Sequence, residues 1–138
     1  MDMTGAPYPE APVVPFIKAV QDRAVLEIQR GCIRGCRFCQ AGMIYRPTRE
    51  RDIESLKKLA KKMLENTGHE EISLSSLSSS DYSKLEELVT FLIDEFHGRG
   101  INISLPSLRI DAFSSVSYTH LLRAKGVNTD GDMEFKRP

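Results

Sequence analysis

Apolar residues recur with helical spacing in two segments of the chain. The apolar face of the first segment consists of Ile53, Leu56, Leu59, Ala60, Met63 and Leu64. That of the second consists of Leu85, Leu88, Val89, Leu92, Ile93 and Phe96. Asp52 suits the N-cap of the first helix and Gly68 its C-terminal stop, while Ser83 and Glu86 have capping-box spacing for the second. The pattern predicts two helices, each packing one face against a core.

Short apolar runs flank these helices and predict three strands, at 24–28, 71–75 and 101–105. Strands that alternate with helices form a parallel sheet with right-handed crossovers, so we expect an α/β fold. Ligands of such sheets bind at the carboxyl ends of the strands. Three segments follow these ends: a cysteine loop, a serine run and residues 107–111.

All three cysteines of the chain, Cys32, Cys36 and Cys39, fall within eight residues at C-x3-C-x2-C spacing, with Phe38 before the third. Three thiolates on one loop can hold three irons of a 4Fe–4S cluster. The fourth iron then has no protein ligand and is open to a substrate or cofactor, as in catalytic metal sites.

Other uses of these cysteines have less support in the sequence. An electron-carrying ferredoxin site takes four cysteines, and a structural zinc site takes four ligands. None of His69, His97 and His120 is spaced like a finger ligand. The odd count and the absence of a secretory signal argue against disulfides. An open iron–sulfur site is favoured, and zinc or chance clustering are the alternatives.

The cysteine loop with Phe38 resembles that of the radical SAM (S-adenosylmethionine) superfamily. Residues 23–32 resemble the strand that enters this loop in cobalamin-associated members. Residues 40–47 and 105–111 resemble a subgroup of uncertain substrate that carries a cobalamin-type domain upstream. The resemblance covers about residues 7–114.

This resemblance implies a partial (βα) barrel of the radical SAM type, truncated here to about three βα units. It implies that Cys32, Cys36 and Cys39 ligate a 4Fe–4S cluster, whose open iron is chelated by SAM. An electron passed through the cluster would cleave SAM into methionine and a 5′-deoxyadenosyl radical, which abstracts hydrogen from a substrate. A flavodoxin- or ferredoxin-like protein would donate the electron, and any cobalamin would bind a domain absent from this chain.

The resemblance also implies roles for residues around the cluster. Phe38 would pack beside it, with its backbone near the adenine, the alternative being an ordinary buried aromatic. Gly31 and Gly35 would permit tight turns. Ser107 and Arg109 would make polar contacts to SAM. For Arg109 the alternative is an ion pair with Asp111 or Glu27.

The segment after the second strand departs from the family. The family motif there usually contains glycine and contacts the SAM amino group, whereas this chain has serines at 75, 76 and 78–80. Ser76 and Ser78 are the candidates for that contact. Without the resemblance, a serine run indicates a polar loop.

Prolines at positions 7, 9, 12 and 15 predict that residues 1–18 form a linker. Residues 19–114 are expected to be the N-terminal part of the radical SAM core. From residue 115 to 138 the apolar pattern decays, which we interpret as an irregular, non-native tail on a truncated fragment. Three strands alone would leave an open sheet edge.

The chain has 19 basic and 19 acidic residues, so its net charge implies no general attraction to nucleic acid. Arginines nevertheless cluster around the cysteines, at positions 30, 34, 37, 46, 49 and 51, with Glu50 the one acid among them. They suit the SAM carboxylate or an anionic substrate such as RNA; the alternative is solvated loop arginines. No apolar run approaches a membrane span, and thiolate ligands favour a cytoplasmic location. Alternative functions are a tRNA methylthiotransferase-like enzyme, a zinc-stabilised binding module or an inactive fragment.

Overall fold

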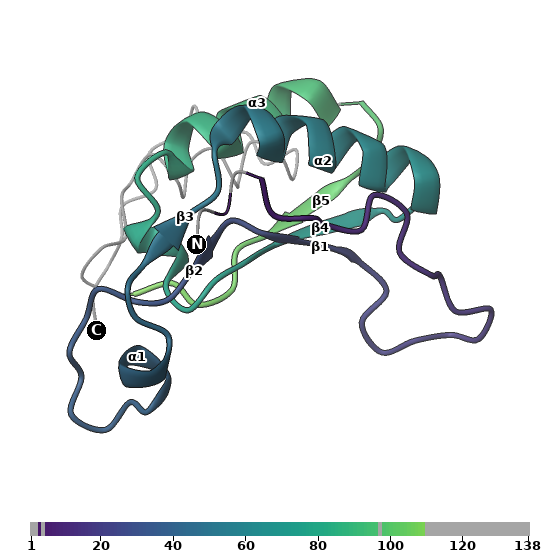
Figure 1. Ribbon diagram of the computed structural model, residues 1–138. Helices are drawn as coiled ribbons and strands as arrows, with labels where there is room; N and C mark the ends of the chain where they lie inside the picture. The colour runs from purple at the N-terminus through teal and green to yellow at the C-terminus, as the bar shows by residue number, and fades with distance from the viewer. Residues whose placement is uncertain (1–2, 4, 97, 110–138) are drawn as a thin grey trace, which may run out of the picture.

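Two helices cover one face of a parallel three-stranded sheet in the computed structural model, which describes residues 3, 5–96 and 98–109 (Figure 1). The sheet has the order β1-β4-β5, with bounds Ala24–Glu27 for β1, Glu71–Ser75 for β4 and Asn102–Ser104 for β5. Helix α2 (Ile53–Thr67) lies between β1 and β4 in sequence, and α3 (Leu85–Phe96) between β4 and β5. The predicted α/β fold with a parallel sheet is confirmed.

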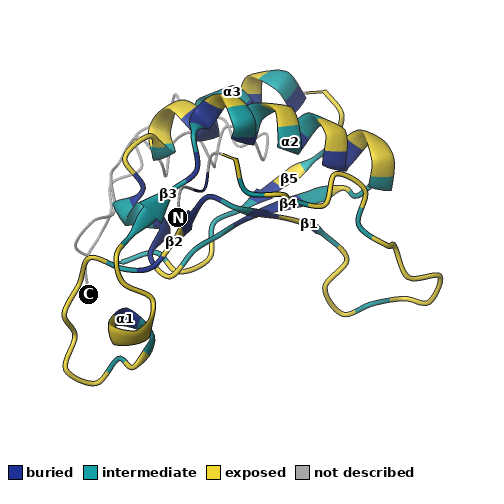
Figure 2. Cartoon of the chain, viewed as in Figure 1, coloured by how far each residue is buried: buried dark blue, intermediate teal, exposed yellow. Residues whose placement is uncertain are grey.

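The core lies between the sheet and the two helices, where Figure 2 shows the buried positions. On β4, Ile72 and Leu74 are fully buried in this core, and they alternate with Ser73 and Ser75. Alternate residues of a strand point to opposite faces, so β4 places Ser73 and Ser75 on the second face of the sheet, where β1 places the partly exposed Val25. Among the described residues no helix covers that face (Figure 1). Parallel sheets covered on both faces have continuous apolar strands instead.

Helix α2 begins and ends where local signals predict. One carboxylate oxygen of Asp52 accepts a hydrogen bond from the backbone N–H of Glu54 at 3.0 Å, and both accept from that of Ser55. These bonds satisfy donors that a helix N-terminus leaves free. The side chain of Ser55 and then these backbone N–H groups lower the pKa of Asp52. Gly68 ends the helix in the left-handed conformation, with φ 71°.

Replacing Asp52 by alanine is expected to lower the free energy of unfolding by about 1 kcal/mol, because the cap oxygens are lost. Urea denaturation of the unliganded chain measures this. Asp52→Asn, which keeps a cap oxygen, should lose less than half as much. Equal losses in the two variants would contradict a capping role.

The start of α3 differs from the prediction. The backbone N–H and hydroxyl of Ser83 donate to the Glu50 carboxylate, so Ser83 does not form the expected capping box, and the helix begins at Leu85. Glu50 belongs to a small hairpin that the sequence pattern did not predict. In this hairpin β2 (Gln29–Arg30) pairs antiparallel with β3 (Arg49–Glu50).

The proline-rich segment contacts the sheet through Tyr8. Its hydroxyl donates to the carbonyl of Val25 at 2.7 Å and accepts from the N–H of Glu27 at 3.1 Å. The Arg51 guanidinium lies 5.1 Å from the centre of its ring. A linker over residues 1–18 stays a prediction, and the predicted tail at 115–138 lies outside the described residues. In the part of the chain that is described, every helix is too short or too polar to cross a membrane.

Candidate functional site

The three segments that follow the parallel strands meet at one edge of the sheet. The ends of β1 and β4 are in register, with Glu27 opposite Ser75, and the N–H of Ile28 donates to the Ser75 carbonyl at 3.0 Å. Beyond β5, the carbonyl of Ser107 accepts a hydrogen bond from the N–H of Ser79 at 3.2 Å. The cysteine loop, the serine run and the segment after β5 therefore border a common region.

The cysteines lie on the loop between β2 and β3, which also holds the short helix α1 (Ala41–Ile44). Cys32 and Cys39 are half-buried, and Cys36 is exposed. The sulfur of Cys32 accepts a hydrogen bond from the N–H of Arg34, and that of Cys39 from the N–H of Gly42, each at 3.4 Å. Amide donors of this kind stabilise thiolates and tune iron–sulfur clusters.

As a donor set, these thiols fit a cluster with three protein ligands. Within residues 3, 5–96 and 98–109, no three metal-ligating side chains are yet gathered into a metal-binding group. Binding would therefore have to draw the three sulfurs together, as metal binding commonly organises its own loop. The donor set therefore fits a cluster, and the positions of the three sulfurs are what binding would change.

A tight hairpin base closes the cysteine loop. Gly31 has φ +90°, and a Cβ built there would clash with the Tyr45 carbonyl oxygen and lie 2.9 Å from that of Pro47. Arg46 joins the two halves of the loop, because its side chain donates to the carbonyls of Gly42 at 2.9 Å and Arg34 at 3.3 Å. The structure thus requires glycine at Gly31.

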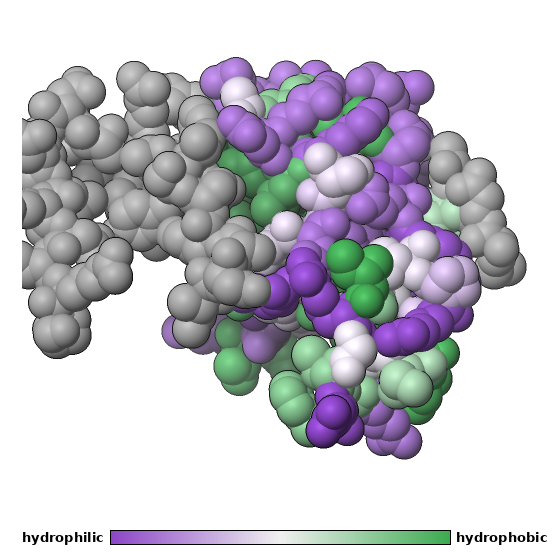
Figure 3. All heavy atoms as spheres, turned by 90° about the vertical axis from the view of Figure 1, so that its left-hand side faces the viewer, coloured by the Kyte–Doolittle hydropathy of each residue, from purple (hydrophilic) through white to green (hydrophobic). Residues whose placement is uncertain are grey.

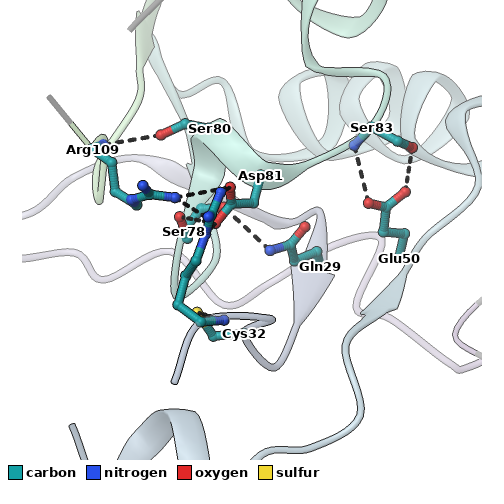
Figure 4. A network of polar contacts seen from close by, with 9 residues as sticks. Gln29, Cys32, Glu50, Ser78, Ser80, Asp81, Ser83 and Arg109 are labelled. Atoms are coloured by element: carbon teal, nitrogen blue, oxygen red, sulfur yellow. Dashed lines mark hydrogen bonds and ion pairs between the residues drawn. The ribbon is translucent and has the colours of Figure 1, made fainter. Parts of the chain in front are cut away.

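Asp81 connects the three segments (Figure 4). Arg34 of the cysteine loop makes a bidentate contact with the Asp81 carboxylate. Its Nη2 donates to Oδ1 at 2.7 Å and its Nε donates to Oδ2 at 3.3 Å. Arg109, after β5, lies 3.2 Å from Oδ1, and the Ser78 hydroxyl donates to Oδ2 at 2.8 Å. The side chain of Asp81 is only 6% exposed. The hydrogen bonds from Arg34, followed by that from Ser78, lower its pKa to about 2.

Arg109 pairs with Asp81 in this network. Glu27, one of the two alternative partners named for Arg109, pairs with Arg30 at 2.7 Å instead. The other expected partner, Asp111, lies outside the described residues. Asp81 was not among the predicted site residues, because its partners lie 47 and 28 residues away in sequence.

Asp81 should make the free energy of unfolding depend on pH. Its pKa is lower in the folded chain than the ordinary 3.8, so the stabilisation is fully present above about pH 4 and is lost as pH falls through about 2. The pKa shift corresponds to a contribution of about 2 kcal/mol to the free energy of unfolding. We expect about 1–2 kcal/mol of it, because the side chain of Arg34 is 43% exposed and solvent screens the ion pair. Asp81→Asn should remove this loss from acid unfolding curves, whereas Asp94→Asn on α3 should keep it. An unchanged curve for Asp81→Asn would contradict the assignment.

The predicted serines serve mainly internal contacts. The hydroxyls of Ser76 and Ser79 lie 2.9 Å apart, and that of Ser79 donates to the Pro106 carbonyl at 2.8 Å. Ser78 is buried and binds Asp81, and its carbonyl accepts from the side-chain amide of Gln29 at 3.2 Å. Roles for Ser76 and Ser78 in SAM binding stay predictions. Ser79 was not among the predicted site residues. It lies in the short 3-10 helix Ser79–Asp81 and is fully buried, and its hydrogen bond to Pro106 connects the serine run to the segment after β5.

The remaining predicted residues lie at the surface of this region. Phe38 is 92% exposed, so it is not an ordinary buried aromatic. Gly35 is exposed and has no positive φ, so its backbone does not require glycine. Ser107 adopts a left-handed conformation, with φ 62°, which is unusual for a residue with a Cβ and is often found at functional sites.

Comparison with known proteins places these features in context. The sequence profile of the Radical SAM superfamily matches residues 26–129. Over 90 residues, the chain is 40% identical to the uncharacterized protein MJ0966 of Methanocaldococcus jannaschii. That alignment covers 65% of this chain and 19% of the archaeal protein, so the chain spans about a fifth of this relative. No solved structure matches the chain.

Proposed function

The chain belongs to the radical SAM superfamily, and from this premise we propose that it forms the cluster-binding part of an enzyme that cleaves SAM reductively. The observation that carries the proposal is the group of three cysteines, C-x3-C-x2-C, on the loop between β2 and β3, shortly after the carboxyl end of β1. Cys32, Cys36 and Cys39 would hold a 4Fe–4S cluster. The β1-β4-β5 sheet would be the first part of a partial barrel.

A 4Fe–4S cluster held by Cys32, Cys36 and Cys39 would supply the electron that breaks a carbon–sulfur bond of SAM. The residues of this chain bind and orient the two groups. The amides of Arg34 and Gly42 donate hydrogen bonds to the sulfurs of Cys32 and Cys39. The contact of Arg34 with Asp81 holds the cysteine loop beside the segments after β4 and β5.

SAM would lie against these two segments. Arg109 and Ser107 are the proposed polar contacts, and exposed Phe38 offers an apolar surface to the adenine. The Ser78 hydroxyl donates to Asp81 and that of Ser76 shares a hydrogen bond with Ser79, so each oxygen keeps a lone pair that could accept from the SAM amino group, as could the backbone carbonyls of this segment.

Use of cobalamin is a further part of the proposal. It is supported by the resemblance of residues 23–32, 40–47 and 105–111 to members that carry a cobalamin-type domain upstream. That domain would have to lie outside this chain. The substrate that receives the radical is left open by the proposal, with RNA among the candidates.

Anaerobic reconstitution with iron and sulfide, followed by SAM and a strong reductant, tests the proposed function. Methionine and 5′-deoxyadenosine should form in equal amounts and only when iron, sulfide and reductant are all present. A protein that takes up zinc without sulfide, or a reduced cluster that leaves SAM intact, would overturn the proposal. The first of these results would favour a zinc-stabilised binding module.

A further inference from the structure

A pocket lies between the N-terminal segment and α2. Its volume of about 360 Å³ is within the range of roughly 300–1,000 Å³ found for small-molecule sites, and residues 6–8 and 10 form one of its walls. This wall is fastened at both ends. The Ala6 carbonyl accepts a hydrogen bond from Nη1 of Arg51 at 3.1 Å, and the Glu10 carbonyl accepts one from the side-chain amide of Asn66 at 3.0 Å. In the described part of the chain, no residue of the cysteine loop, the serine run or the segment after β5 lines the pocket, so it is separate from the proposed SAM site.

Arg51 lines this pocket and is buried without a neutralising acid. It is 3% exposed, and no carboxylate among the described residues forms an ion pair with it. Its guanidinium lies over the Tyr8 ring and binds the Ala6 carbonyl, but its Nε–H is buried and has no hydrogen-bond partner among those residues. Burying an unpaired charge or an unbonded N–H is costly. Although Arg51 is close in sequence to the arginines of the cysteine loop, its surroundings are those of an anion site elsewhere.

Two lysines of α2 add positive charge to the pocket. Lys62 pairs with Glu10 at 2.8 Å, and both side chains are about half exposed. Lys58 is exposed and has no hydrogen bond or ion pair in the part of the chain described. Asp52 acts on Lys58 electrostatically, but its carboxylate caps α2 and does not line the pocket. The lining thus has three basic side chains, including Arg51, and one acidic side chain, which gives a net charge of +2.

Exposed lysines alone do not mark a binding site. The helical layer, at the top of Figure 3, is mostly hydrophilic, as the solvated faces of helices generally are. The pocket differs from that surface because the buried Arg51 lies beside apolar walls formed by Pro7, Tyr8 and Leu59. A ligand that fits should combine a doubly charged anionic group with an apolar part.

We propose that this pocket binds the phosphate group of a small organic phosphate monoester. Such a group carries a charge of about −1.5 to −2 at pH 7, which matches the charge of the lining, whereas each phosphate of a nucleic-acid strand carries one charge. Arginine donates to phosphate through a planar fork, and lysine attracts it as a point charge. The apolar part of the ligand would contact Tyr8 and Leu59, so the ligand would bridge the N-terminal segment and α2. The proposal does not depend on the chemistry proposed for the cysteines.

Calorimetric titration of the full, unliganded chain with phenyl phosphate at constant ionic strength tests the proposal. We expect one saturable site, with an affinity at least about fivefold higher than that for inorganic phosphate, because the ring adds apolar contact. Lys58→Gln should weaken binding about fivefold, near the upper limit for an exposed ion pair, and Arg51→Gln at least about tenfold. Lys84→Gln, the same charge change at an exposed position before α3, should leave the affinity unchanged.

Amide chemical shifts locate the binding. Phenyl phosphate should shift the amide signals of residues 6–10 and 51–62 and leave those of residues 32–46 in place. Because Lys58 is exposed, Lys58→Gln keeps the proposal testable if Arg51→Gln does not fold.

The proposal would be overturned by the absence of saturable binding, or by equal affinities in wild type and Lys58→Gln. Shifts confined to the cysteine loop, or inorganic phosphate that binds as tightly as phenyl phosphate, would also overturn it. Tighter binding of a polyuridine oligonucleotide at the same residues would replace it by a nucleic-acid surface.

Discussion

Replacing Cys36 by alanine is expected to abolish reductive SAM cleavage. Loss of one of three thiolate ligands should lower both cluster content and 5′-deoxyadenosine formation by at least about 100-fold, since even outer contacts of metal ligands are worth about 10–100-fold. Cys36 is exposed, so its truncation should change the stability of the unliganded chain by less than about 0.5 kcal/mol. Iron and sulfide analysis, product chromatography and urea denaturation measure the three quantities.

A matched control is Gln40→Ala, at an exposed position next to Cys39. It should keep cluster content and cleavage within a factor of about two, as expected for a surface substitution. Cleavage retained in Cys36→Ala, or lost equally in both variants, would defeat the assignment of the cysteines as cluster ligands.

Gly31→Ala should cause the largest loss of stability among the substitutions considered. An alanine at φ +90° is strained by about 1–2 kcal/mol. Its Cβ would also clash with the Tyr45 carbonyl and press on that of Pro47, which adds about 1–3 kcal/mol. The free energy of unfolding of the unliganded chain should therefore fall by about 2–5 kcal/mol, and cluster uptake should fall with it.

Gly68 provides the control for backbone strain. It has φ +71°, but a Cβ there would meet no atom within 4 Å. Gly68→Ala should thus cost about 1–2 kcal/mol, the strain alone. Equal losses for the two glycines would show that the base of the cysteine loop is not closely packed.

Features set by neighbouring residues were predictable from the sequence. Helix α2 lies between Asp52 and Gly68 as expected, because its cap and its stop act within a few residues. Strand β4 has the predicted bounds, and the parallel sheet followed from the alternation of strands and helices. The cysteine spacing is equally local, and it led to the superfamily that the profile match also gives.

Features set by distant residues were not predictable. Ser83 binds Glu50, 33 residues away, and this contact replaces the capping box that the local pattern favours. The β2–β3 hairpin has two-residue strands, too short for any periodicity to reveal. Asp81 follows a serine run that reads as a polar loop, and its importance comes only from arginines that folding brings to it.

Electron paramagnetic resonance of the reduced, reconstituted chain, recorded with and without SAM, tests the central claim most directly. We expect a 4Fe–4S signal that changes when SAM is added, because SAM would bind the iron that lacks a cysteine. Failure to form a cluster, or a cluster signal that SAM leaves unchanged, would contradict the account.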